Sequence, residues 1–102
     1  MTDDPMSTRV SHAPIRLEEI EEARTRIEGA AIRTPLVRLE IDLPQTEIYL
    51  KLECLQPIGS FKIRGAASAI RSAPPGAIAG GVFTTSAGNM AQGVAWIARE
   101  EG

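Results

Sequence analysis

Two segments of this chain each have the pattern of a strand that ends in a glycine-containing turn and continues as a helix. In the first, apolar and polar residues alternate over residues 47–53, which predicts a strand with one buried face. Breakers follow at residues 56–59, and a helix rich in small residues is expected from Phe61 to about Arg71. Ser60 is placed to cap that helix, because a serine hydroxyl can accept a hydrogen bond from a free backbone N–H.

The second segment repeats this order further along the chain. Residues 81–85 are apolar and β-branched, so we expect a short buried strand there. Residues 86–89 predict a turn, and a helix is expected over residues 90–101. Strands that alternate with helices predict an α/β fold, here a partial, mainly parallel sheet with flanking helices.

A helix is also expected ahead of both segments. Apolar residues recur from Leu17 to Ala31 at spacings of three and four, which is typical of one face of a helix. Gly29 could end this helix early. Between the helix and the first predicted strand, residues 36–39 suggest a short extended stretch and residues 43–45 a turn.

Composition excludes several classes of protein. The 102 residues carry a net charge of −2, and the 11 basic residues are scattered, so we expect neither a nucleic-acid partner nor a membrane surface. The single cysteine, Cys54, cannot form an internal disulfide, and no signal peptide is apparent, which makes a cytoplasmic protein the default expectation. Residues 1–15 are expected to form a polar tail that includes His12, and residues 16–102 the folded part.

The start of each predicted helix could hold an anion or a cofactor. Helix N-termini present free N–H groups and a positive partial charge, and ligands collect at the carboxyl ends of parallel strands. Lys62 lies in the first turn after Ser60, where the helix field favours the neutral amine that acts as a nucleophile. From its position alone, Lys62 is better explained as an ordinary solvated surface lysine than as a nucleophile.

Residues 86–93 offer the second candidate. Their hydroxyl, side-chain amide and consecutive backbone N–H groups could bind a carboxylate. A capped helix start, with Ser86 or Asn89 as the cap and Gly88 in the turn, explains the same residues without a ligand.

Taken together, the two segments resemble a known family. Residues 60–66 (SFKIRGA), preceded by residues 52–57 (LECLQP), are similar to the segment that holds the pyridoxal-phosphate (PLP) lysine in threonine dehydratases, serine dehydratases and serine racemases. Residues 86–93 (SAGNMAQG) resemble the asparagine loop of the same family, and residues 33–36 (RTPL) match its usual opening. The resemblance covers about residues 16–102.

The resemblance implies a role for each matching residue. Lys62 would form a Schiff base with PLP and move the α-proton of the substrate, and Phe61 would pack beside the cofactor ring. Asn89 would donate a hydrogen bond to the 3-hydroxyl of the ring. The substrate carboxylate would be surrounded by residues of the asparagine loop, which are Ser86, Ala87, Gly88, Asn89 and Met90, while Gln92 would support the loop. No metal is implied.

One departure from the family pattern, and one difference from related enzymes, bear on substrate and reaction type. Many members of the family have histidine at the position of Met90, so selectivity could differ if that imidazole contacts the substrate. Cysteine synthases, by contrast, carry Asp-Arg after the lysine and Thr-Gly after the asparagine, where this chain has Ile63-Arg64 and Met90-Ala91. This pattern favours a dehydratase or a racemase over a β-replacement enzyme.

The implied reaction is the conversion of L-threonine or L-serine to a 2-oxo acid and ammonia. Such a reaction would belong to amino-acid metabolism, for example to isoleucine biosynthesis. Elimination and racemisation remain open alternatives, because both begin with removal of the same proton. Full-length members are expected to be homo-oligomers that act on a small amino acid.

The resemblance also implies missing parts. The glycine-rich phosphate cradle of the family has no counterpart, since Gly80-Gly81 is too short and precedes a predicted strand. We therefore expect an incomplete piece of the two-domain fold-type II PLP architecture, with weak stability and no dehydratase activity by itself. The alternative is a non-catalytic remnant or a small interaction module.

Overall fold

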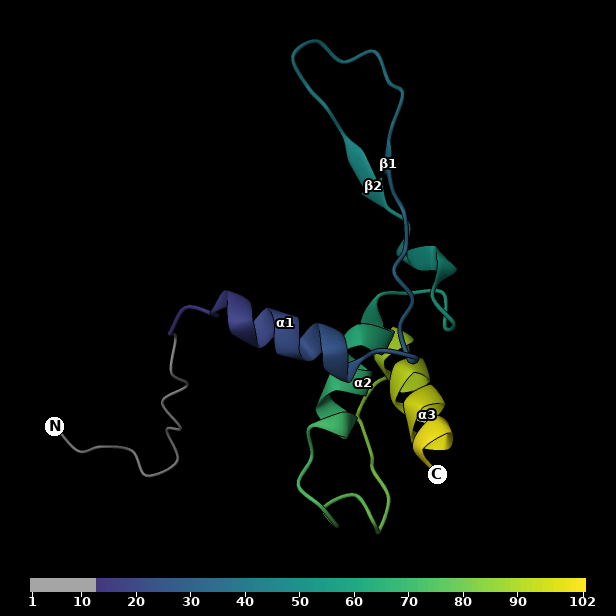
Figure 1. Cartoon of the computed structure of the whole chain (residues 1–102). Helices are drawn as coiled ribbons and strands as arrows, with labels where there is room; N and C mark the ends of the chain where they lie inside the picture. Colours follow the sequence, from purple (N-terminus) through teal and green to yellow (C-terminus); the bar gives the residue numbers. More distant parts are fainter. Residues whose placement is uncertain (1–12) are drawn as a thin grey trace, which may run out of the picture.

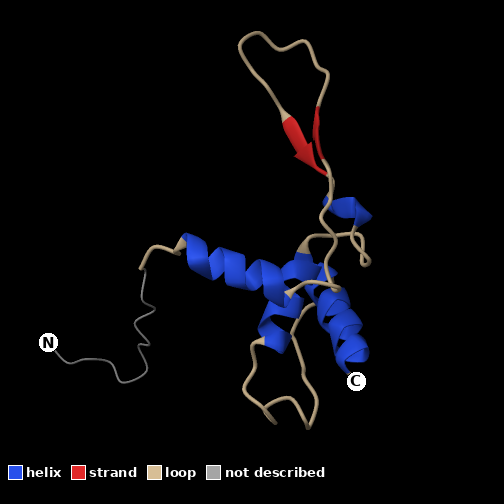
Figure 2. Ribbon diagram, in the orientation of Figure 1, coloured by secondary structure: helices blue, strands red, loops and turns tan. Residues whose placement is uncertain are grey.

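The computed structural model of the chain describes residues 13–102, and the predicted tail, apart from residues 13–15, lies with His12 outside this range. In chain order the elements are α1 (Leu17–Arg26), β1 (Leu36–Arg38), β2 (Tyr49–Lys51), the 3₁₀ turn η1 (Glu53–Leu55), α2 (Lys62–Arg71) and α3 (Asn89–Glu101). Helices α2 and α3 lie side by side, whereas α1 and the β1–β2 hairpin project from them in different directions (Figures 1 and 2).

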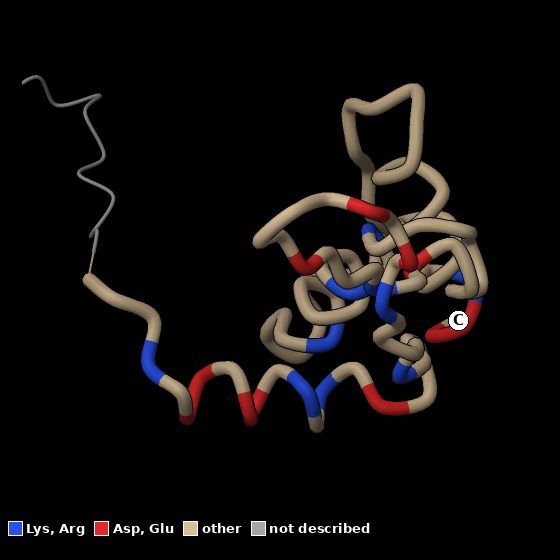
Figure 3. Tube along the Cα trace, turned by 90° about the horizontal axis from the view of Figure 1, so that it is seen from above, with Lys and Arg blue, Asp and Glu red and all other residues tan. Residues whose placement is uncertain are grey.

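Helix α1 forms where the sequence predicts it but ends earlier. The backbone N–H of Arg16 donates to the Glu19 carboxylate at 2.8 Å, which satisfies one free end of the helix. The chain leaves the helix after Arg26, and Gly29 then adopts a φ of +81°, a conformation that glycine tolerates best. None of the residues of α1 is buried, and acidic and basic residues are interspersed along it (Figure 3). Its predicted apolar face therefore reaches the core only beyond the helix, through Ile27 and Ala31.

The expected parallel sheet is wrong for the described residues. Strands β1 and β2 pair in antiparallel orientation, with Leu36 opposite Lys51 and Arg38 opposite Tyr49. The connection over residues 39–48 contains no helix, and parallel neighbours need a longer crossover, usually through a helix. The predicted turn at residues 43–45 is present, where Thr46 N–H donates to Leu43 C=O at 3.3 Å. Both strands are exposed, so the alternating pattern at residues 47–53 predicted the strand but not its burial.

The predicted buried strand over residues 81–85 is also absent. These residues are exposed and belong to no sheet, and 95% of the Phe83 surface is accessible. A strand is stabilised by hydrogen bonds to a neighbouring strand, and the sheet in the described chain contains only β1 and β2, at the far side of the molecule (Figure 2). Residues 81–85 therefore have no neighbouring strand among the described residues with which to pair, despite their β-branched composition.

The core lies where α2 crosses α3. It consists of small and branched apolar residues, which are Ala30, Ile63, Ala66, Ala67, Ile70 and Ile97. Gly93 of α3 makes the closest approach, because a Cβ atom at this position would lie 3.3 Å from both the Ala66 Cβ and the Lys62 carbonyl oxygen. The absence of a side chain at Gly93 therefore lets α3 lie directly against the first turns of α2.

Little of the remaining chain is covered. The radius of gyration is 17.8 Å, compared with about 13 Å for a compact domain of 100 residues. Large apolar side chains of the hairpin and of residues 78–83 are exposed. Within residues 13–102 no helix combines the length and the apolar character needed to cross a membrane. The crossing of α2 and α3 is thus the main stabilising contact.

This crossing predicts opposite effects for two glycines. We expect Gly93→Val to lower the free energy of unfolding by about 1–3 kcal/mol, because the new side chain would overlap Ala66 and the Lys62 carbonyl. Gly65→Ala is the matched control: a Cβ added at Gly65 in α2 would meet nothing within 4 Å, so alanine should stabilise the helix by up to about 1 kcal/mol. Urea unfolding followed by circular dichroism measures both. A Gly93→Val variant as stable as the unaltered chain would show that the helices do not cross here.

Candidate functional site

Lys62 is the first residue of α2, one residue later than the sequence predicts the helix to begin. Phe61 occupies the cap position with helical backbone angles, and no side chain caps the helix. Ser60 still contributes, since its hydroxyl accepts a long hydrogen bond from the Lys62 backbone N–H at 3.4 Å. The Lys62 ammonium lies 5.2 Å from the centre of the Phe61 ring, within the range of a cation–π contact. The half-buried amine is thus placed beside an exposed aromatic ring.

Asn89 is the first residue of α3, and Gly88 precedes it as the cap residue. The turn before it is ordered by its own polar groups, because Gly88 N–H donates to the Ser86 hydroxyl at 3.2 Å. Gln92 N–H then donates to the Gly88 carbonyl at 3.2 Å. Asn89 and Gln92 are exposed, whereas Met90 between them packs against the core.

The structure brings some of the predicted site residues together. Phe61 and Asn89 line one open hollow of about 470 Å³, together with Ser60, strand β2 including Lys51, and residues of the β2–α2 connection. Lys62 adjoins it through Phe61, and its carbonyl faces Gly93 of the asparagine loop. Thus the helix crossing joins the two motifs that the sequence places 27 residues apart, from Lys62 to Asn89.

Other predicted site residues lie apart from this hollow. Ser86, Ala87 and Gly88 are exposed in the loop before α3 and do not line it. Met90 instead faces an apolar groove with Phe83 and Val94. Gln92 is exposed on the first turn of α3. Among residues 13–102, moreover, no group of His, Cys, Asp and Glu side chains is arranged to hold a metal ion.

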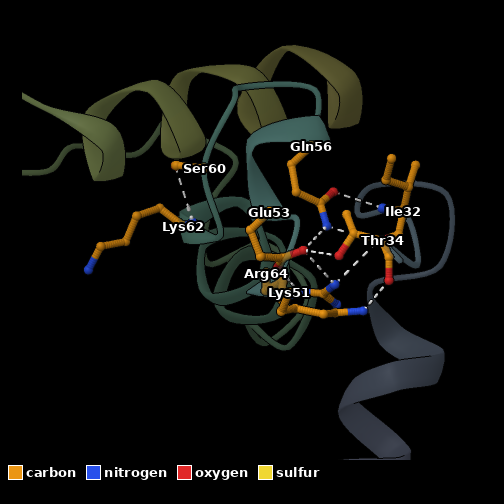
Figure 4. Close-up of polar contacts among 8 residues, drawn as sticks. All are labelled: Ile32, Thr34, Lys51, Glu53, Gln56, Ser60, Lys62 and Arg64. Carbon is orange, nitrogen blue, oxygen red and sulfur yellow. Dashed lines mark hydrogen bonds and ion pairs between the residues drawn. The ribbon is translucent and has the colours of Figure 1, made fainter. Parts of the chain in front are cut away.

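A set of polar side chains, here called the polar cluster, lies on the other side of α2 (Figure 4). It comprises Thr34, Lys51, Glu53, Gln56 and Arg64. The Arg64 Nε pairs with Glu53 Oε1, and Arg64 Nη2 donates to Glu53 Oε2 at 3.2 Å. Glu53 Oε2 also accepts hydrogen bonds from the Thr34 hydroxyl at 2.5 Å and the Gln56 amide at 3.0 Å. Several donors therefore converge on one carboxylate.

Gln56 links this carboxylate to the chain that precedes β1. Its side-chain oxygen accepts from Ile32 N–H at 2.9 Å, and its nitrogen donates to Ile32 C=O at 2.8 Å. Lys51 adds a hydrogen bond from its ammonium to the Thr34 carbonyl. Gln56 and Thr34 are 4% and 3% exposed, and no buried side-chain polar atom in the described chain lacks a partner. The polar cluster thus connects α2 to both ends of the hairpin.

The convergence of donors stabilises the charged form of Glu53. Hydrogen bonds from Arg64, and then from Thr34 and Gln56, lower the pKa of this carboxyl from 4.5 to about 2, although partial burial opposes the change. The same pair raises the pKa of Arg64. The ion pair is therefore present at every pH above the acidic range.

The sequence does not reveal the polar cluster. Its members are separated by up to 30 residues, from Thr34 to Arg64, and neither helical nor strand periodicity relates positions so far apart. The available signal is that Glu53, Gln56 and Arg64 flank the predicted lysine within the motifs that resemble the PLP-lysine segment.

The lowered pKa predicts an acid-sensitive contribution from Glu53. Because its native pKa lies below its usual value, the stabilisation is fully present above pH 4.5 and is lost as the pH falls towards 2. We expect Glu53→Gln to have a lower free energy of unfolding than the unaltered chain at neutral pH. This difference in free energy should become smaller as the pH falls from 4.5 towards 2. Urea unfolding at a series of pH values measures it.

Glu47→Gln is the control, since the Glu47–Arg38 pair is 3.7 Å long and its side chains are 63% and 53% exposed. Such a pair contributes little at any pH. A Glu53→Gln difference that stays constant down to the acid limit would contradict the assignment.

Comparison with known proteins supports the resemblance found in the motifs. The family model described as "Pyridoxal-phosphate dependent enzyme" matches residues 27–102. A putative threonine dehydratase of Sinorhizobium fredii is 43% identical over 90 residues, covering 86% of this chain and 27% of that protein. The L-threonine dehydratase catabolic TdcB of Staphylococcus aureus strain N315 is 39% identical over 102 residues, covering 97% of this chain and 29% of that protein. No solved structure matches the chain significantly.

These matches cover nearly all of the described chain but little more than a quarter of each relative's length. They include the β2–α2 connection, α2, the asparagine loop and α3, and so both motifs and the residues that line the hollow. This chain belongs to the family of pyridoxal-phosphate dependent enzymes.

Proposed function

We propose that this chain carries the PLP-binding lysine and part of the substrate loop of a threonine or serine ammonia-lyase, acting as part of a longer chain. The observation that carries the proposal is the packing of α3 against the first turns of α2. It places Phe61 and Asn89 on one hollow, with the Lys62 amine beside the aromatic ring. The names of the two relatives support threonine as the substrate.

The residues at this hollow fit one side of the cofactor. The Lys62 amine can bind an aldehyde covalently, the Phe61 ring is free to cover a flat heterocycle, and the Asn89 amide can donate to a phenolic oxygen. When bound, PLP supplies an electron sink that stabilises negative charge at the substrate α-carbon. The phosphate of the cofactor would be held by residues outside the 102 in this chain.

The proposed roles follow from what each group can donate or accept. Lys62, with its amine free, would take the proton from the α-carbon of the bound amino acid. Ser86 and the backbone N–H groups at the start of α3 would bind the substrate carboxylate, because a helix N-terminus favours an anion. Loss of the β-hydroxyl as water, followed by hydrolysis in which another water replaces the amino nitrogen, would yield a 2-oxo acid and ammonia.

Two finer points are part of the proposal. Met90 packs against the core, so it would act through its backbone N–H rather than through its side chain, and histidine would not be required there. Gln92 would support the loop through its backbone hydrogen bond to Gly88. The S. aureus relative is named a catabolic enzyme, which favours threonine breakdown over isoleucine biosynthesis.

Reductive trapping tests the lysine directly. The chain has only two lysines, Lys51 and Lys62, so borohydride treatment after PLP addition followed by peptide mapping distinguishes them. We expect the label on Lys62, and its loss in Lys62→Arg, which keeps the charge but removes the reactive amine. Equal labelling of Lys51 and Lys62, at the level of a free lysine, would refute a specific site and favour a non-catalytic remnant.

Turnover is expected to require the remainder of the fold. The chain spans under a third of the length of the relatives it matches, and the resemblance to the family implies a glycine-rich phosphate cradle that these 102 residues do not contain. We therefore expect no ammonia release from threonine by this chain with added PLP. Turnover that disappears in Lys62→Arg would show instead that these 102 residues suffice.

A further inference from the structure

We propose that the Glu53–Arg64 pair acts as a positioning device for Lys62, fixing the direction in which the amine leaves α2. The inference rests on the proposed function of Lys62. It adds a role for two residues to which the proposed function assigns none.

Helical geometry links the two side chains. Successive residues of an α-helix are rotated by about 100°, so residues two apart lie on nearly opposite faces. Lys62 and Arg64 are two apart at the start of α2. Figure 4 shows Arg64 pointing into the polar cluster, whereas the Lys62 amine points away from it. A fixed direction for Arg64 therefore fixes the opposite direction for Lys62.

The Arg64 side chain is held in one orientation by several hydrogen bonds. Its guanidinium contacts both oxygens of Glu53 and donates to the Ile32 carbonyl at 3.2 Å. Glu53 is held in turn by Thr34 and Gln56, and Gln56 forms two hydrogen bonds with the Ile32 backbone. Planar, two-point pairing specifies orientation as well as distance. The polar cluster thus restrains the rotation of the first turns of α2 about the helix axis.

The beginning of α2 lacks another polar constraint of this quality. Phe61 at the cap forms no side-chain hydrogen bond to the helix. The hydrogen bond from the Lys62 backbone N–H to the Ser60 hydroxyl is long, at 3.4 Å. Gly93 restrains the helix from a second side through van der Waals contact with the Lys62 carbonyl and Ala66. Apolar contact between small residues limits separation more than rotation, so the directional restraint comes from Arg64.

Loss of the guanidinium should therefore weaken cofactor capture by Lys62. We expect Arg64→Met to raise the dissociation constant for PLP at Lys62 by about tenfold, towards the value for Nα-acetyl-lysine, since small misplacements of a reacting group are costly. Arg64→Lys keeps the charge but cannot pair at two points, so it should restore only part of the affinity. Borohydride trapping over a range of PLP concentrations measures each constant.

Arg71→Met is the matched control. Arg71 is also on α2 and is also anchored, through Glu101 at 2.8 Å and the carbonyls of Arg26 and Glu28. It lies at the other end of the helix, so its loss should reduce stability without changing the affinity at Lys62. An equal loss of affinity in Arg71→Met and Arg64→Met would overturn the proposal, because any weakening of the fold would then suffice.

A measurement without cofactor separates this inference from the proposed function. If the unaltered chain does not capture PLP at Lys62, the proposed function fails, and amide hydrogen exchange still tests the positioning device. Faster exchange in Arg64→Met at residues 64–66 than at residues 67–71, with the reverse in Arg71→Met, would support it. Unchanged exchange at residues 64–66 would overturn it.

Discussion

The close approach of α2 and α3 at Gly93 is the contact on which the rest of this structure depends. It buries Ile63 and Ile97, the largest fully buried side chains of the described residues, and it forms most of the contact between separate elements. It also sets the two motifs side by side, because Gly93 belongs to the asparagine loop and its neighbours, Lys62 and Ala66, to the lysine motif. The same helix crossing therefore builds the core and brings the two motifs together.

A second constraint acts on the opposite face of α2. The polar cluster joins this helix to the chain on both sides of the hairpin through an ion pair and several side-chain hydrogen bonds. The Glu53–Arg64 pair is partly buried, so its net contribution to stability is modest, but loss of either partner leaves a partly buried charge without its counter-charge. In this chain, the ion pair favours one rotation of the first turns of α2, while Gly93 allows α2 and α3 to lie close together.

Local sequence predicted the helices better than the strands. Helices α2 and α3 begin within one residue of their predicted starts, and Gly29 ends the first helical region as expected, because these boundaries depend on neighbouring residues. Residues 81–85 have strand-like composition but no partner strand, and residues 36–39 pair in a direction that their own pattern does not encode. Strand pairing depends on distant segments, which periodicity does not report.

Some parts of the candidate site could likewise be predicted from local sequence, whereas others could not. The motifs identified Lys62 and Asn89, and the structure places Phe61 and Asn89 on a common hollow. It leaves Ser86, Ala87 and Gly88 in an exposed loop, and only the structure reveals the link from Glu53 to Arg64. That link could not be read from the sequence, since it depends on how the hairpin returns to α2.

The most direct test of this account is a titration of PLP into the isotope-labelled chain, followed by NMR. If the starts of α2 and α3 form one cofactor site, the backbone resonances of Phe61, Lys62 and Asn89 should shift together with a common dissociation constant. Shifts confined to the neighbourhood of the two lysines, with Asn89 unaffected, would contradict the account.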